Sequence, residues 1–504
     1  MISRIDLKCS GGNIAFATTL LLTLWFSGCA ELQQTLDAYD NAPVSAPATA
    51  VQPVAARAGQ GEDGAPLFGL AISGGGSRAA VFTASALEAL AELRLEGADA
   101  NTSVLERVQY LSSVSGGSMA AAYYAVQKPP RREPMLAPNG LTPAYRDFFD
   151  QFHVAMKMDF ERNKFVSFFS PKGFAESLQS DWEEKFFHRM TFGQLRAREL
   201  AGDSPVLMLN GTLYNTGRRL AMTTLPREQF RYDFARSLQR VLQSPDVDLS
   251  RVQQVLQTQT LQDLNFSYRA LPLSVAVAAS ASVPLLIGPV HLHAHGPEHE
   301  HYHVGDGGLF DNLGVESLME VVLKQLDASP ARRALVVMID AAQPFDIADE
   351  AIGKENDLLG LFKRSPSRIS DIMEQRAQAY QLVLWKMLLV LRSRRDDVGQ
   401  VQVVHLHLTD DVWDGYDDLP SACAAEKEFA KLGQGDADVQ KMKQRIRQRI
   451  ATIPTRFQIN ACNQALVAEA ARRTVRRHAP EILGFWAARA PASKRAAARE
   501  ARSP

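Results

Sequence analysis

A serine lies between small residues in the segment 108–120, VQYLSSVSGGSMA, where an apolar run meets a helix-forming run. Ser115 is followed by Gly116 and Gly117, and Ser113 precedes it by two positions. The nucleophile elbow of serine hydrolases, G-x-S-x-G, turns sharply from a strand into a helix and needs small residues on both sides of the serine. Ser113 stands where that motif has its first glycine. By itself the segment fits either a nucleophile or an ordinary serine N-cap.

A second segment holds three successive glycines, Gly74, Gly75 and Gly76, followed by Ser77 and Arg78. Backbone N–H groups of such a loop, at the start of a helix, can point at an anion. Directed at the oxygen of a tetrahedral intermediate, each such donor contributes a few kcal/mol to acyl transfer. A phosphate-binding loop is disfavoured, because neither a following GK[ST] nor the spacing G-x-G-x-x-G is present.

A third segment, VGDGGLFDNLGV at 304–315, places Asp306 before paired glycines. A carboxylate held on a glycine turn could act as the base that takes a serine proton. Asp-Gly is also a common turn sequence, so this segment is a weak signal when taken alone.

Six of the chain's eleven histidines lie just before Asp306, in HLHAHGPEHEHYH at 291–303. Two groups of three share strand parity, so a hairpin turning at Gly296-Pro297 would gather imidazoles on one face. Such a face could bind a transition metal such as zinc, with His291, His293, His301 and His303 as the candidate ligands. We favour the alternative, a solvated polar hairpin. His303 as a catalytic base is disfavoured, because it is only three residues from Asp306 on the same segment.

These segments need a scaffold, and apolar runs alternate with helical patterns along the chain. The runs that predict strands are 67–73, 108–114, 205–213, 218–225, 334–340 and 400–408, and the first helical patterns are 80–97 and 117–127. Alternation of this kind indicates an α/β layered fold. A long helical pattern at 371–392 includes the charged residues Asp371, Glu374, Arg376 and Lys386, so we expect it to cover the core and not to span a membrane.

Residues 148–192 hold eleven of the 24 phenylalanines, interleaved with charged residues. We favour an amphipathic helical subdomain packed on the sheet. The alternative is an apolar lid or acyl-chain groove, since lipid substrates need a concave and mostly apolar site.

The N-terminus has the pattern of an export signal. Arg4 and Lys8 precede an uncharged apolar run at 14–26, which is too short for a comfortable membrane span. The following Phe-Ser-Gly-Cys is similar to a bacterial lipobox, whose cysteine is lipidated and becomes the new N-terminus. We therefore predict a signal peptide at 1–28, a lipid anchor at Cys29 and a flexible linker over 29–65.

The charge balance excludes an overall nucleic-acid-binding field, because 55 Lys and Arg face 56 Asp and Glu. Basic residues gather only near the C-terminus, and we predict a solvated Ala/Arg-rich tail over 466–504. Cys423 and Cys462 are the thiols left in the mature chain. An exported compartment permits a disulfide between them, although the sequence does not show whether they meet.

Taken together, GGGSR at 74–78, SVSGG at 113–117 and DGG at 306–308 resemble the patatin-like phospholipase family. Lesser echoes at 210–220, 279–284 and 453–457 extend the resemblance over roughly 65–460. It implies a three-layer α/β/α fold with a central, mostly parallel sheet and a Phe-rich helical insertion. It also implies an acyl hydrolase with a Ser-Asp dyad and no cofactor. Carried over by position, Ser115 is the nucleophile, Asp306 is its base, and the oxyanion hole involves Gly74, Gly75, Gly76 and Arg78.

The expected protein is a hydrolase domain over 66–465, with 148–192 as a helical lid or insertion. We expect it to cleave carboxylic esters of phospholipids or related lipids, as a phospholipase A or lysophospholipase does. Its anchor would hold it on a membrane of a bacterial envelope, facing the periplasm. Ala30 is not the Asp that often signals inner-membrane retention, which favours the outer membrane. Two rivals are a catalytically silent lipid-binding envelope protein and an esterase or thioesterase acting on soluble substrates.

Overall fold

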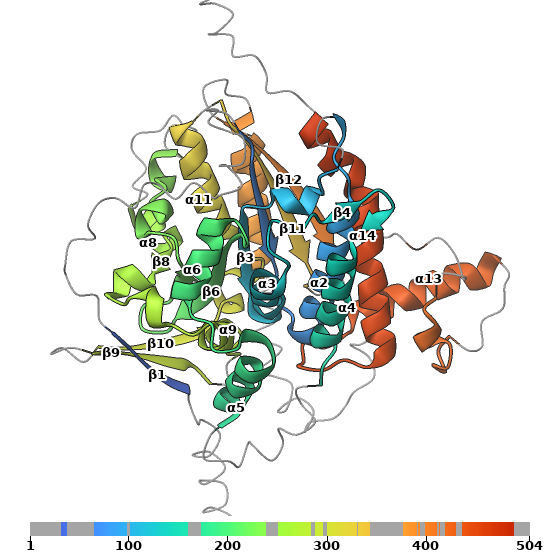
Figure 1. Ribbon diagram of the computed structural model, residues 1–504, viewed down its shortest axis with the longest axis horizontal. Coiled ribbons are helices and arrows are strands. Elements are labelled where there is room, and N and C mark those ends of the chain that lie inside the picture. The colour runs from blue at the N-terminus through green and yellow to red at the C-terminus, as the bar shows by residue number, and fades with distance from the viewer. Residues whose placement is uncertain are drawn as a thin grey trace, which may run out of the picture.

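A ten-stranded mixed sheet forms the centre of the protein (Figure 1), in the order β1-β9-β10-β6-β3-β2-β11-β12, with β7 beside β6 and β8 beside β7. The computed structural model describes residues 32–37, 65–97, 101–159, 173–237, 250–283, 288–295, 300–329, 331–342, 376–390, 392–393, 399–410, 413, 419–429 and 436–487. The strands are β1 (Leu32–Asp37), β2 (Leu67–Ile72), β3 (Tyr110–Val114), β6 (Val206–Leu213), β7 (Arg218–Thr223), β8 (Gln259–Thr260), β9 (Val290–His295), β10 (His301–Asp306), β11 (Arg333–Asp340) and β12 (Gln400–His407). A separate small ribbon pairs β4 (Leu136–Ala137) with β5 (Gly140–Leu141).

The middle of the sheet is parallel. Strands β6, β3, β2, β11 and β12 all run in one direction, and β10 and β9 continue the sheet in antiparallel pairing. Every residue of β2 and β3 is buried, as expected for parallel strands covered on both faces. The predicted mostly parallel α/β sheet is confirmed. The segments that leave β2 and β3 therefore lie side by side at one edge of the sheet.

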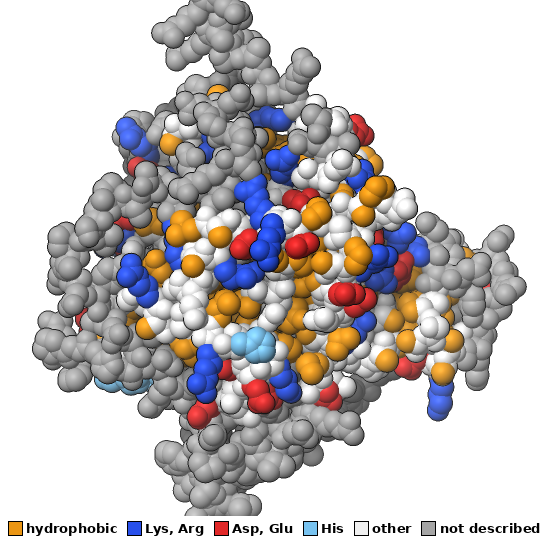
Figure 2. Space-filling view, in the orientation of Figure 1, with side chains coloured by type: hydrophobic (Ala, Val, Ile, Leu, Met, Phe, Trp, Pro, Cys, Tyr) orange, Lys and Arg blue, Asp and Glu red, His pale blue; other side chains and the backbone are white. Residues whose placement is uncertain are grey.

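Helices cover both faces of the sheet (Figure 1). On one face, α14 packs on α2, which also contacts α3 and α4. On the opposite face, α11 and the helical residues 376–390 contribute to a second core. The helices are α2 (Gly76–Glu92), α3 (Ser115–Gln127), α4 (Pro143–Met156), α5 (Gly173–Trp182), α6 (Phe192–Ala201), α8 (Ser250–Leu256), α9 (Leu273–Ser280), α10 (Gly308–Asp311), α11 (Val315–Ala328), α13 (Asp436–Ala451) and α14 (Ala461–Ala487). On the face drawn in Figure 2, basic and acidic side chains are interspersed with hydrophobic ones.

The described part of the Phe-rich segment 148–192 packs into the main core. The buried phenylalanines are Phe148, Phe149 and Phe152 on α4, Phe186 and Phe187 in a π-helical turn, and Phe192 at the start of α6. The Phe152 ring stacks on Tyr123 of α3 with centroids 4.9 Å apart. Residues 160–172 lie outside the described residues. The described phenylalanines thus form a helical layer on the sheet.

The C-terminal region differs from the predicted solvated tail over 466–504. Helix α14 continues to Ala487 and buries an apolar side that includes Val467, Ala471 and Val475. These residues recur at helical spacing between the arginines, so the helix is amphipathic and packs on α2 and β12. The prediction is therefore wrong as far as Ala487, and the folded domain extends beyond residue 465. Residues 488–504 lie outside the described residues.

The N-terminal prediction also needs one correction. Residues 32–37, inside the predicted flexible linker, form β1 and pair in parallel with β9 along their whole length. The predicted signal peptide, Cys29 and residues 38–64 lie outside the described residues. No helix within the described ranges is long and apolar enough to cross a membrane.

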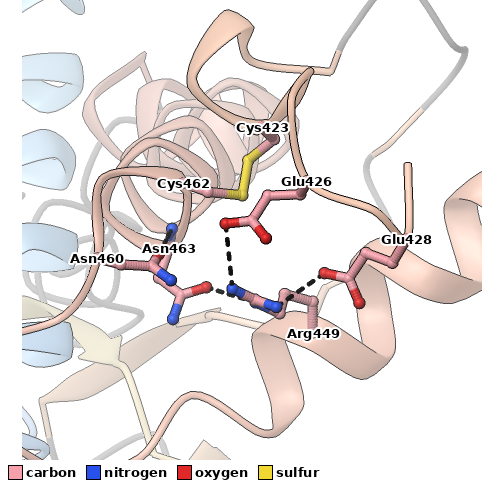
Figure 3. The surroundings of a disulfide bond; sticks show 7 residues. All are labelled: Cys423, Glu426, Glu428, Arg449, Asn460, Cys462 and Asn463. Carbon is pink, nitrogen blue, oxygen red and sulfur yellow. Dashed lines mark hydrogen bonds and ion pairs between the residues drawn. A yellow bond between two sulfur atoms is a disulfide. The ribbon is translucent and has the colours of Figure 1, made fainter. Parts of the chain in front are cut away.

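The two remaining cysteines meet. Cys423, at the end of a short 3-10 turn, forms a disulfide with Cys462 in the first turn of α14 (Figure 3). Beside it, Arg449 of α13 donates hydrogen bonds to Glu428 at 2.8 Å and to Asn463 at 2.7 Å. The bond and these contacts hold the segment after β12 and α13 against α14.

Cys423→Ser is expected to lower the stability of the protein. Closing a loop of 39 residues removes chain entropy from the unfolded state, which corresponds to about 4 kcal/mol in the simple loop model. Thermal denaturation of the variant and the wild type, with and without reductant, measures the effect. Reductant should lower the wild-type melting temperature and leave that of the variant unchanged. A wild-type melting temperature that reductant does not alter would contradict a stabilising role for the bond.

Candidate active site

Ser115 occupies a sharp turn between β3 and α3. It is the first residue of α3, its φ is 53°, and its side chain is almost fully buried. A non-glycine residue at positive φ is uncommon and costs energy, so the surrounding structure must hold it there. This is the strand–turn–helix geometry that the sequence around Ser115 predicts.

The glycines around this turn are required by close backbone contacts. A Cβ at Gly116 would collide with the backbone of Gly76, and one at Gly117 would collide with the carbonyl oxygen of Ser73. The loop that follows β2 therefore lies directly against the Ser115 turn. Gly-Gly after the serine is the sequence signal of this contact.

Ser280, the last residue of α9, fixes the backbone of the turn. Its hydroxyl accepts a hydrogen bond from the Ser115 N–H at 3.1 Å and donates one to the Asn210 carbonyl at 2.6 Å. The Ser118 hydroxyl lies 2.8 Å from it and 3.1 Å from that of Ser113. All these groups are buried. Sequence reasoning missed Ser280, although a serine ending the apolar run LSVAVAAS was a usable signal.

Asp306 is the last residue of β10, and its carboxyl lies beside the Ser115 turn. Burial raises its pKa to about 6, while the Gly308 N–H, 2.7 Å from Oδ1, and the nearby Ser115 hydroxyl oppose that rise. Within the described residues, Oδ2 has no partner at hydrogen-bonding distance. Ser115 and Asp306 are thus brought together, close enough for the serine hydroxyl to lower the pKa of the carboxyl. Catalytic hydrogen bonds often tighten only when substrate binds.

The four residues predicted for the oxyanion hole have different surroundings. The Gly74 N–H is already bonded to the Asn312 carbonyl at 2.9 Å, so it is not free to bind an oxyanion. A Cβ at Gly74 would lie 3.2 Å from that of Ser115 and would collide with Asn312. Gly75 and Gly76 both have positive φ, and their N–H groups have no acceptor within the described part of the chain. Only these two glycines keep the predicted free donors.

Arg78 also differs from its predicted role in the oxyanion hole. Its buried guanidinium donates to the carbonyls of Ala341, at 2.7 Å, and Ile453, and lies 3.4 Å from the Thr455 hydroxyl. These acceptors come from the end of β11 and from the segment 453–457. Arg78 therefore ties the glycine loop to two distant segments and is a positioning residue in this structure.

A narrow pocket opens at Ser115. Its volume is about 30 Å³, and its lining is mostly apolar, including Met119, Met156, Trp182 and Phe457. A space this small holds about two water molecules, so an acyl chain needs these side chains to move apart.

Strands β9 and β10 pair as the predicted hairpin requires, and the described imidazoles gather in pairs. The predicted turn at Gly296-Pro297 lies outside the described residues. His291 Nε2 lies 3.0 Å from His303 Nδ1, and the rings of His293 and His301 pack edge to face with centroids 4.3 Å apart. Burial and the neighbouring histidines lower the pKa of His293. Among the described residues, no three His, Cys, Asp or Glu side chains are arranged to hold a metal ion.

Ser280→Ala is expected to lower kcat by about 10- to 100-fold with little change in KM. The substitution leaves the buried Ser115 N–H without its partner, at a cost of about 1–3 kcal/mol, and loosens the strained turn. Ser118→Ala is the matched control, because the Ser118 hydroxyl belongs to the same hydrogen-bonded chain but bonds to Ser113 and Ser280. Steady-state kinetics on a soluble ester and melting temperatures separate the two variants. Equal kinetics in both would show that Ser280 does not position Ser115.

A family model and solved phospholipase structures are similar to this chain. Residues 70–319 match the family model of patatin-like phospholipases. The chain is similar to human GIVD cytosolic phospholipase A2, with a TM-score of 0.43, 12% identity, and coverage of 83% of this chain and 59% of that one. For the same enzyme with methyl gamma-linolenyl fluorophosphonate and terbium chloride the TM-score is 0.37, with 13% identity and coverage of 83% and 58%. The chain thus spans less than two thirds of these structures. A search of curated proteins found no match.

Proposed function

Because residues 70–319 are a patatin-like phospholipase domain, we propose that the protein is a serine acyl hydrolase that cleaves carboxylic esters of phospholipids or related lipids. The reaction would be of the phospholipase A or lysophospholipase type. The observation that carries the proposal is the buried carboxyl of Asp306, whose Oδ2 has no partner among the described residues, beside the strained Ser115.

In the proposed mechanism, Ser115 Oγ attacks the ester carbonyl while its proton passes to Asp306 Oδ2. With a pKa of about 6, most of the Asp306 carboxyl is ionised at neutral pH and can accept that proton. The N–H groups of Gly75 and Gly76 would stabilise the oxyanion. Asp306 then gives the proton to the leaving alkoxide, which leaves an acyl-serine. Water hydrolyses the acyl-serine, with Asp306 again acting as the base.

We further propose lipid anchoring at Cys29 in a bacterial envelope, facing the periplasm and attached to the outer membrane. The Cys423–Cys462 disulfide supports an oxidising compartment, because such bonds persist in exported proteins. Incorporation of a labelled fatty acid by the wild type, and its loss in Cys29→Ser, tests the anchor.

A soluble acyl ester is the second candidate substrate, because the narrow pocket of about 30 Å³ admits little of a long chain. Rates on a short-chain ester in solution and on micellar phospholipid distinguish the two. We expect a higher kcat/KM on the micellar phospholipid. A preference for the dissolved ester, with no turnover of phospholipid, would contradict the lipid substrate.

A further inference from the structure

We propose that β1 is a docked tether that holds the lipid anchor beside the catalytic edge of the sheet, so that the mouth of the Ser115 pocket faces the membrane. The proposal rests on the lipid anchoring at Cys29 proposed above. It depends on where β1 binds, in which direction it runs, and how few residues separate it from Cys29.

The strand register places the start of β1 close to Asp306. Leu32 pairs with Val290 of β9, and Val290 pairs with Val304 of β10, two residues before Asp306. Two strand spacings across the sheet and two residues along it correspond to roughly 12 Å between the Cα atoms of Leu32 and Asp306. Figure 1 shows β1 lying beside β9 and β10.

The direction of β1 determines which of its ends faces the site. It runs parallel to β9, so Leu32 lies near the end of the hairpin that carries Asp306, and Asp37 pairs with His295 near the hairpin tip. Antiparallel pairing would instead place Leu32 beside His295, five residues along β9 and about 17 Å further from the catalytic edge. The parallel register therefore directs the chain upstream of β1 to the catalytic edge.

The chain between Cys29 and Leu32 is short. Three residues, fully extended, span at most about 10 Å, so a lipid on Cys29 stays within roughly 22 Å of Asp306. Without β1, the tether would run from Cys29 to the start of β2 at Leu67, which is 38 residues along the chain. A flexible chain of that length has a root-mean-square span of about 35 Å and a far larger reach. Docking of β1 thus shortens the tether between the anchor and the folded domain from 38 residues to three.

Docking also covers an otherwise open edge of the sheet. Among the described strands, β9 pairs with β10 on one side, and β1 occupies its other side over six consecutive residues. An exposed edge strand offers unpaired N–H and C=O groups to any other chain, and β1 satisfies them. The same pairing therefore protects the hairpin of Asp306 and sets the position of the anchor.

Two insertions on either side of β1 test the proposal. One variant carries about twelve Gly and Ser residues between Ala30 and Glu31, and its matched control carries the same insert between Ala48 and Thr49. Both are made in the lipidated full chain and bound to vesicles of phosphatidylethanolamine and phosphatidylglycerol. The measurements are hydrolysis of vesicle lipid and of a short-chain ester in solution.

The insert before β1 is expected to reduce vesicle hydrolysis about tenfold. The tether between Cys29 and β1 becomes about five times longer, and the effective concentration of vesicle lipid at the active site falls with the 3/2 power of tether length. The insert after β1 should change it less than twofold, since docked β1 isolates that segment from the anchor. Hydrolysis of the dissolved ester should be the same in both variants. When residues 32–37 are replaced by Gly and Ser, the two inserts should become equivalent.

Equal effects of the two inserts on vesicle hydrolysis, with β1 intact, would overturn the proposal. The proposal also assumes the lipid anchor at Cys29 and the hydrolase activity, and each assumption is overturned by a result of its own. A wild type that incorporates no fatty acid lacks the anchor, and one that hydrolyses neither substrate lacks the proposed activity.

Discussion

Ser115→Ala is expected to reduce ester hydrolysis by about 10⁴-fold and to abolish covalent labelling by a fluorophosphonate. The side-chain hydroxyl is the only group that the substitution removes, and in the proposed mechanism it forms the bond to the acyl group. The Ser115 N–H bond to Ser280 comes from the backbone, so the turn keeps that support in the variant.

Ser118→Ala is the matched control for this variant. Ser118 is another buried serine of α3, three residues further along the chain, and its hydroxyl belongs to the chain of hydrogen bonds that ends at Asn210. We expect it to be labelled like the wild type, as seen by in-gel fluorescence, while Ser115→Ala shows no label. Equal labelling of all three proteins would mean that another residue is the nucleophile. An unlabelled wild type would favour the catalytically silent binding protein.

Asp306→Asn is expected to reduce kcat by at least about 10³-fold, because an amide cannot accept the serine proton. In the wild type, kcat/KM should rise with pH through about 6, the pKa of Asp306, since only the ionised carboxyl acts as a base. The variant should lack this rise. Initial rates on a soluble ester between pH 4 and pH 8 measure both effects.

The same substitution should stabilise the fold. Because burial raises the pKa of Asp306 above its ordinary value of 3.8, folding favours the protonated form. The stability that this carboxyl contributes is complete at low pH and is lost as the pH rises through about 6. At pH 7 and above, Asp306→Asn should therefore gain up to about 3 kcal/mol in free energy of unfolding. Denaturant unfolding at two pH values tests the sign.

Asp311→Asn is a suitable control for the kinetic effects of Asp306→Asn. Asp311 is also buried, its pKa is raised to about 7 by burial and by Glu316, and its side chain accepts backbone N–H groups at the start of α11. We expect a loss of kcat of less than tenfold there. A comparable loss in both variants would assign the Asp306 effect to general damage at a buried carboxyl. A gradual rise of kcat/KM through pH 6 in Asp306→Asn would assign that limb to another group.

The sequence was sufficient for features that depend on local pattern. Apolar runs predicted β2, β3, β6, β7, β11 and β12, and glycine pairs marked the places where backbones nearly touch. The histidine spacing predicted a hairpin because side-chain parity is a local property of a strand. The phenylalanines of α4 packed inward for the same reason, since their spacing of three and four residues follows one face of a helix.

The features that the sequence did not predict correctly depend on partners that are distant in sequence. Strand β1 has no apolar alternation of its own, and it is defined by pairing with β9 more than 250 residues later. The arginines of α14 concealed its buried side because they are also spaced along a helix. The Gly74 N–H and the Arg78 guanidinium looked available in the sequence, but Asn312 and Ala341 occupy them. Hydrogen-bond partners at such separations leave no local signal.

Arg78 carries a further consequence, for the order in which the protein matures. Its acceptors Ile453 and Thr455, together with Arg456, which receives the Ser77 N–H at 2.7 Å, come from near the end of the chain. During N-to-C-terminal synthesis these residues are added about 375 residues after Arg78. The glycine loop therefore stays without its final support until residue 456 has been made and folded against it. A protein truncated after residue 319 would retain the whole family segment and still lack these supports.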